Sequence, residues 1–177
     1  MPLSTLSKRK QGFTILELFI ITVIVAILAF VGWRSFKLSK DIERESIVRR
    51  NMRVVEVAAK AYFKDSGGTF PPNNDDPGYL SYFPGGSCDQ KGTRAGNFPI
   101  NPFTSRPEAP QAGHISDVAQ VRQRGPIQIG SAGQIFYSPI AAPDSGEITS
   151  FAVQGADHDG LSIGGSQPNT SLVLSNQ

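Results

Sequence analysis

Hydrophobic and polar positions change their pattern twice along the chain. Residues 13–33 are apolar almost throughout, with Glu17 as their only charge. Beyond them, apolar residues recur mostly at steps of three and four without an interrupting proline, which is typical of an amphipathic helix. The pattern therefore predicts that the apolar helix continues as a stem over residues 34–65, and that the Gly67-Gly68 pair ends it.

The rest of the sequence has no helical period. Residues 66–113 are rich in proline and glycine but hold many aromatic side chains, which predicts an ordered connecting loop packed on the stem. Within residues 114–177, four short apolar or alternating runs predict strands: Gln128 to Gly130, Gln134 to Pro139, Thr149 to Gly155 and Ser171 to Ser175. The expected fold class is α+β, a long N-terminal helix packed on a small antiparallel β-sheet that needs the stem as its second layer.

The apolar segment has the length of a membrane span. At 1.5 Å per residue, its 21 residues cover about 31 Å as a helix, which is the thickness of a bilayer's hydrocarbon core. A carboxylate in such a helix costs roughly 2.5 to 3.5 kcal/mol at the centre and less near an end. Glu17 is therefore expected to have a partner or a task.

The start of this segment resembles the N-terminal motif of type IV prepilins and of the related pseudopilins of type II secretion. The resemblance lies in a basic run, Lys8-Arg9-Lys10, and in the run after it, Gly12-Phe13-Thr14-Ile15-Leu16-Glu17. Apolar residues follow directly after Glu17. In that family a membrane peptidase removes a short basic leader after the glycine, and the new N-terminal residue is N-methylated. The resemblance implies a leader at residues 1–12, cleavage between Gly12 and Phe13, N-methylation of Phe13 and a role for Glu17 in assembly.

The same resemblance implies a pilin-like fold and a non-enzymatic function. It identifies the chain as a structural filament subunit. The lack of a disulfide, the short predicted sheet and the Asp157 to Gly160 loop favour a pseudopilin of a type II secretion system, with a pilin for adhesion, motility or DNA uptake as the alternative. The implied partners are further copies of the chain, the prepilin peptidase, an inner-membrane assembly platform and membrane lipid, and no cofactor is required. The implied location is the inner membrane, crossed once with the N-terminus in the cytoplasm, and after assembly a periplasmic or extracellular filament.

Two other interpretations of the N-terminal region are weaker. An ordinary secretory signal would be cut after Ala29, but such signals rarely carry an acid, and the apolar run continues to Trp33. An uncleaved signal anchor leaves Glu17 unexplained.

The charges beside the apolar segment oppose the implied orientation. Lys and Arg near the ends of a membrane helix favour the cytoplasmic side, and seven of them lie within residues 34–53, whereas only three precede the helix. The orientation therefore rests on the resemblance alone.

Charge is unevenly distributed beyond the apolar segment. Residues 34–64 carry nine Lys and Arg against four Asp and Glu, whereas residues 65–177 carry five against ten. Loss of the leader's three basic residues changes the formal net charge from +2 to −1, so the chain's basic balance does not indicate a nucleic-acid partner. A basic stem followed by an acidic C-terminal region favours contacts between subunits or with anionic lipid headgroups. An ordinary solvated surface accounts for this charge distribution equally well.

Candidate catalytic chemistry is sparse. His114 and His158 lack the spacing of metal ligands, and the sequence has no nucleophile elbow, paired-cysteine metal motif or phosphate loop. This argues against the rival class, a membrane-anchored periplasmic enzyme or binding domain. Cys88 is the only cysteine, so the C-terminal region cannot be held by an intrachain disulfide.

One loop carries a candidate metal site. Asp157 and Asp159 lie two residues apart before Gly160, and the loop resembles the calcium loop near the C-terminus of major pseudopilins. The same residues also form a good hairpin turn between two apolar runs. Calcium takes six to eight oxygen ligands, and the sequence offers two carboxylates here. A calcium site and a plain turn both stay open, and the turn is the favoured interpretation.

Overall fold

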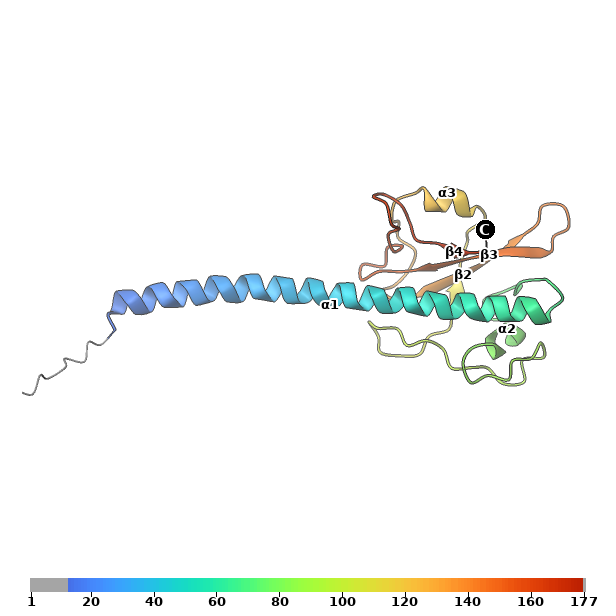
Figure 1. The fold of residues 1–177 in the computed structure, drawn as a ribbon, viewed down its shortest axis with the longest axis horizontal. Helices are drawn as coiled ribbons and strands as arrows, with labels where there is room; N and C mark the ends of the chain where they lie inside the picture. The colour runs from blue at the N-terminus through green and yellow to red at the C-terminus, as the bar shows by residue number, and fades with distance from the viewer. Residues whose placement is uncertain (1–12, 177) are drawn as a thin grey trace, which may run out of the picture. The chain divides into compact units, whose positions relative to one another are not determined.

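Helix α1 (Ile15–Asp65) is the longest element of the computed structural model, which describes residues 13–176 (Figure 1). The chain divides into two units, one ending at Lys40 and one formed by Asp41–Gln177, and each is described by itself. The predicted leader, including the Gly12 side of the predicted cleavage site, lies outside the described residues.

Glycines end α1 where the sequence predicts it. Gly67 and Gly68 have φ values of +78° and +103°, which L side chains rarely adopt. The Gly68 N–H donates to the Phe63 carbonyl over 3.2 Å and so satisfies one of the free carbonyls of the last turn. The stem predicted to end at residue 65 therefore ends there.

The second unit contains a four-stranded sheet in the order β1-β2-β3-β4. Its strands are β1 (Gln111–Ala112), β2 (Ile135–Ala141), β3 (Ile148–Gly155) and β4 (Leu174–Ser175). The pairs β2–β3 and β3–β4 are antiparallel, but β1 pairs with β2 in parallel. The fold is therefore α+β, a long helix with a small mixed sheet, and the prediction of a purely antiparallel sheet is wrong.

Two features explain why the mixed sheet was not predicted. Strand β1 has two residues, too few to show an alternating pattern. Its parallel pairing requires a crossover, which contains the short helix α3 (Val118–Arg122). The strand predicted at Gln128 to Gly130 is also absent, since Gln128 forms only an isolated bridge with Leu161.

The two faces of the sheet pack against different elements. Helix α1 covers one face and α3 lies on the other (Figure 1). The α1 side holds the main core, which joins buried residues of the helix to those of β2 and β3: Val48, Met52, Val55, Tyr137, Phe151 and Val153. The α3 side holds a smaller core of Val118, Ala152 and Val173. Consecutive residues Ala152 and Val153 thus serve opposite faces, as the pleat of a strand requires.

The connecting loop is anchored to the main core by aromatic residues. Its short helix α2 (Pro77–Ser81) begins at Asp76, whose side chain accepts a hydrogen bond from the Tyr79 N–H. The buried Tyr79 hydroxyl donates to the Val55 carbonyl of α1, and the Tyr137 hydroxyl donates to the Pro71 carbonyl. Burial raises the pKa of both phenols, so both remain neutral donors at physiological pH.

Gly155 allows the close approach of β3 to α1. A Cβ there would lie 2.8 Å from both Met52 Sδ and Val48 Cγ1. We expect Gly155→Ala to reduce the free energy of unfolding by about 1 to 3 kcal/mol, the usual cost of overpacking a core. Denaturant unfolding of the detergent-solubilised chain measures this. The matched control is Gly164→Ala, whose Cβ would meet nothing closer than the Thr170 carbonyl oxygen at 3.8 Å; equal stability of the two variants would contradict the prediction.

Candidate functional site

The first turn of α1 is closed by a capping box that includes Glu17. The Thr14 N–H donates to Glu17 Oε2 over 2.9 Å, and the Thr14 hydroxyl donates to the same oxygen over 3.0 Å. In return the Glu17 N–H donates to the Thr14 hydroxyl over 3.2 Å. Each side chain thus satisfies a backbone N–H that the helix leaves free. Sequence reasoning missed this partner, although Thr14 and Glu17 have the capping-box spacing.

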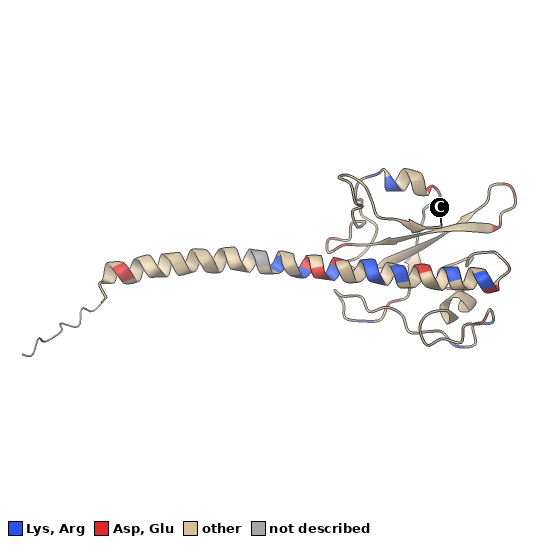
Figure 2. Cartoon of the chain, in the orientation of Figure 1, with Lys and Arg blue, Asp and Glu red and all other residues tan. Residues whose placement is uncertain are grey.

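The described residues after Phe13 form an unusually exposed apolar surface. Every residue of 13–33 is exposed, including Phe13 at 79%. Helix α1 contains an 18-residue window of mean hydropathy 2.8 with no buried residue, and by length and composition it can span a membrane. Glu17 is the only acidic residue of this surface, which is otherwise uncharged in Figure 2 up to the Lys-rich turns.

Aromatic and basic side chains follow at the end of the apolar surface. Lys37 Nζ lies 5.9 Å from the ring centroid of Trp33, and Lys40 Nζ lies 4.5 Å from that of Phe36. Both distances fall within the range of cation–π attraction. Aromatic and Lys side chains of this kind are enriched where a helix leaves the hydrocarbon core, so they fit a membrane boundary near Trp33.

The stem between Asp41 and Asp65 carries its excess basic charge on the solvent side. Three pairs are local along the helix: Arg44 with Asp41, Arg49 with Glu45, and Lys60 with Glu56. Arg50 and Arg53 form no ion pair with the described residues, and both remain exposed. Figure 2 shows Lys and Arg concentrated on the later turns of α1 and acidic residues scattered over the loops.

The C-terminal loop uses Asp157 to build its turn. Asp157 Oδ1 accepts hydrogen bonds from the N–H groups of Asp159 (2.8 Å) and Leu161 (2.9 Å). The Asp157 N–H donates to the Leu161 carbonyl, and Gly160 takes a φ of +81°. The loop is therefore a closed turn in which one oxygen of Asp157 is already committed to the backbone.

Of the two predicted metal ligands, Asp157 belongs to the acidic and histidine group that the fold brings together, and Asp159 does not. Asp159 Oδ2 lies 3.1 Å from His158 Nε2, and the Asp159 side chain is largely exposed. The group whose ligand atoms all lie within 4.8 Å of one another is Glu45, Asp157 and His158. It contains an imidazole nitrogen and two carboxylates, whereas calcium is bound by six to eight oxygens. The geometry therefore gives the calcium interpretation little support.

We expect the melting temperature of the chain to be the same with millimolar Ca²⁺ as with a chelator, because the turn accounts for the described contacts of Asp157. Differential scanning calorimetry in calcium and in chelator tests this. Asp159→Ala is the informative variant, since it removes a predicted ligand without removing a backbone hydrogen bond of the turn. A calcium-dependent rise in melting temperature that Asp159→Ala abolishes would establish the calcium site instead.

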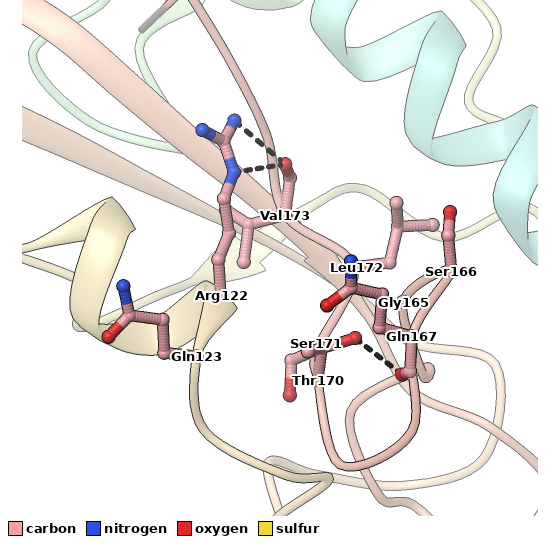
Figure 3. A pocket seen from close by; sticks show the side chains of 9 residues that line it. All are labelled: Arg122, Gln123, Gly165, Ser166, Gln167, Thr170, Ser171, Leu172 and Val173. Carbon is pink, nitrogen blue, oxygen red and sulfur yellow. Dashed lines mark hydrogen bonds between the residues drawn. The ribbon is translucent and has the colours of Figure 1, made fainter.

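Hydrogen bonds hold the C-terminal segment in place of a disulfide. Arg122 on α3 donates to the Val173 carbonyl from Nε (3.4 Å) and from a terminal nitrogen (3.2 Å), and both bonds are drawn in Figure 3. The Ser171 hydroxyl donates to the Arg124 carbonyl over 2.9 Å. Near the end of the chain, Asn176 Oδ1 accepts from the Ser150 hydroxyl over 2.7 Å. The segment is thus tied to α3 and to β3.

We expect Arg122→Met to loosen this segment selectively. The methionine keeps much of the apolar part of the arginine side chain but loses its charge-assisted hydrogen bonds, each worth about 1.5 to 3 kcal/mol. Hydrogen exchange at the amides of residues 171–174 should accelerate roughly tenfold or more, while exchange in β2 stays unchanged. Gln123→Met, at the exposed neighbouring position, is the control. Equal exchange in the two variants would show that packing alone holds the segment.

The remaining candidate residues lie apart from one another. Cys88 is exposed, with a φ of +53°, in the connecting loop. His114 is exposed after β1, and His158 belongs to the C-terminal turn, where its Nδ1 lies 3.8 Å from Glu45 Oε1. The sequence could not indicate this last contact, because the two residues are far apart along the chain.

Comparison with known proteins finds no matching family model, no matching curated protein and no matching solved structure.

Proposed function

We propose that this chain is a structural subunit of a type IV pilus-like filament, most closely a pseudopilin of a type II secretion system. It is processed after Gly12, N-methylated at Phe13 and assembled through its N-terminal helix. The observation that carries the proposal is the position of Glu17. It is the only charge among residues 13–33, and it lies in the first turn of α1, within the apolar part of the helix that is exposed throughout.

Electrostatics gives Glu17 a role after cleavage. Removal of the leader would leave a positive amine on Phe13, next to the positive end of the α1 dipole. Two positive charges in this position are unfavourable in a medium of low dielectric constant, where charge interactions are strong. A negative Glu17 side chain offsets both, in its own chain or in a neighbouring copy. The capping box supports this role because it holds the carboxylate at the helix start.

The exposed apolar surface supports the proposed partners. Such a surface is stable in lipid, where every backbone group of the helix is satisfied internally. On leaving the membrane it must be covered, and the same surface on other copies is the simplest cover for a self-assembling subunit. The prepilin peptidase and an inner-membrane assembly platform are the further partners that this route requires. The stem and sheet of Asp41–Gln177 then form the part of each subunit outside the membrane.

A shear experiment tests the proposal. Cells that produce the chain with a prepilin peptidase, an assembly platform and its ATPase should release it as filaments on shearing, visible by electron microscopy with an antibody against the sheet unit. Without the platform, the chain should remain in the membrane fraction. Release as a monomer that lacks residues 13–29 would refute the proposal and indicate an ordinary signal peptide.

A further inference from the structure

An apolar groove lies between the later turns of α1 and the segment that follows α2. Its volume is about 330 Å³. Its apolar walls are formed by Val54, Val57 and Ala58 of the helix and by Tyr82 and Pro84 of the connecting loop. Val57 is 64% exposed. Apolar surface that is rimmed by polar residues is typical of a place where a partner protein docks.

Two arginines give this groove a positive charge. Arg50 and Arg53 both line it, both are exposed, and neither forms an ion pair with the residues that the structure describes. Glu56, one turn further along the helix, is already paired with Lys60 over 2.6 Å. No described Asp or Glu lines the groove. The groove therefore suits an occupant that carries apolar side chains together with free carboxylates.

The tip of the β2–β3 hairpin has this composition. Three small apolar residues, Ala141-Ala142-Pro143, are followed by Asp144 and Glu147. Both acids are exposed, and their carboxylates form no hydrogen bond or ion pair with the described residues. Asp76 and Asp117, by contrast, accept hydrogen bonds at the starts of α2 and α3. The hairpin tip is thus an exposed segment with two negative charges that its own copy does not use.

The hairpin and the groove are placed for contact between two copies. In Figure 1 the hairpin lies on the sheet side of α1, whereas α2 and its loop lie on the opposite side. The hairpin also lies near the end of α1, because the Ile148 carbonyl accepts from the Phe70 N–H over 2.9 Å. Arg53 lies 12 residues before the last residue of α1, Asp65, which is about 18 Å along the helix axis. A second copy shifted along the stem by about this distance brings its hairpin level with the groove.

We propose that the β2–β3 hairpin of one copy docks in the stem groove of the next copy. The two hairpin carboxylates pair with Arg50 and Arg53, and the apolar residues beside them cover Val57. Because the two surfaces differ, the contact is heterologous and can repeat from copy to copy, as an open filament requires. The inference rests on the proposed function and names a contact between the subunits of that filament.

Disulfide cross-linking in filaments of the full chain tests the contact. In a Cys88→Ser background, Val57→Cys combined with Ser145→Cys should give dimers, trimers and larger species on a non-reducing gel, because each copy bonds to a different neighbour on either side. Val57→Cys combined with Gln120→Cys, an exposed position on α3, should give none. If the natural chain forms filaments but the first pair gives no species larger than a dimer, this inference is refuted and the proposed function stands. Absence of filaments from the natural chain would refute both.

Charge reversal tests the pairing without a cross-link. Arg53→Glu should reduce the yield of sheared filaments about tenfold, the loss of roughly one charge-assisted contact, and Glu147→Arg should do the same. The two changes together should restore the yield to within about twofold of the natural chain, since opposite charges then meet again. Arg106→Glu makes the same charge change outside the groove and should leave the yield unchanged. A double variant that is processed normally but assembles no better than either single variant would overturn the proposal.

Discussion

Glu17→Gln should abolish filament formation while leaving cleavage after Gly12 and membrane insertion intact. Glutamine has nearly the same shape and can still accept from the Thr14 N–H, so the capping box survives. The variant loses the negative charge that would attract the Phe13 amine. In a medium of low dielectric constant this attraction is much stronger than in water. The yield of sheared filaments, compared with the amount of processed chain in the membrane, measures the effect.

The matched control separates capping from charge. Thr14→Val removes the hydroxyl that bonds to Glu17 but keeps the carboxylate, so filament yield should stay within about twofold of the natural chain, because one cap contributes only about 1 kcal/mol. If Glu17→Gln assembled normally and Thr14→Val did not, the role of Glu17 would be to cap the helix. That outcome would remove its proposed part in assembly.

Gly12→Val should leave the whole chain in the membrane as uncleaved precursor. The resemblance places Gly12 directly before the scissile bond, and a branched side chain there would obstruct the peptidase at the bond that it cuts. The precursor would keep the leader's three basic residues and so migrate as a larger, more basic species. Immunoblots of membranes from cells with and without the peptidase measure the ratio of the two forms. Gln11→Ala should be cleaved normally, and equal processing of both variants would place the cut elsewhere.

The long elements of the fold could be predicted because their signals are local. An apolar run, a helical period and a glycine pair define α1 and its end, and the alternating runs predict β2 and β3 to within two residues. Helix α2 could also have been predicted from the sequence, since Asp76 followed by Pro77 is a typical helix start. It was missed because the surrounding prolines and glycines favour a loop.

The features that escaped prediction depend on contacts between distant residues. Strand β1 exists only because Gln111 and Ala112 meet β2 in parallel, and two residues carry no pattern of their own. The contact between Glu45 and His158 joins α1 to the C-terminal turn, and the unpartnered amide of Gln154 follows from packing around it. The restraint of the C-terminal segment by Arg122 is of the same kind. Sequence reasoning could state that a restraint was needed but could not identify it.

The N-terminus of the mature chain tests the central claim most directly. Mass spectrometry of the protein purified from membranes with an active prepilin peptidase should find a chain that begins at Phe13 and carries one additional methyl group on its amine. A chain that begins at Phe30, after an ordinary signal cleavage, would contradict the filament-subunit account, as would a chain that retains the leader in the presence of the peptidase.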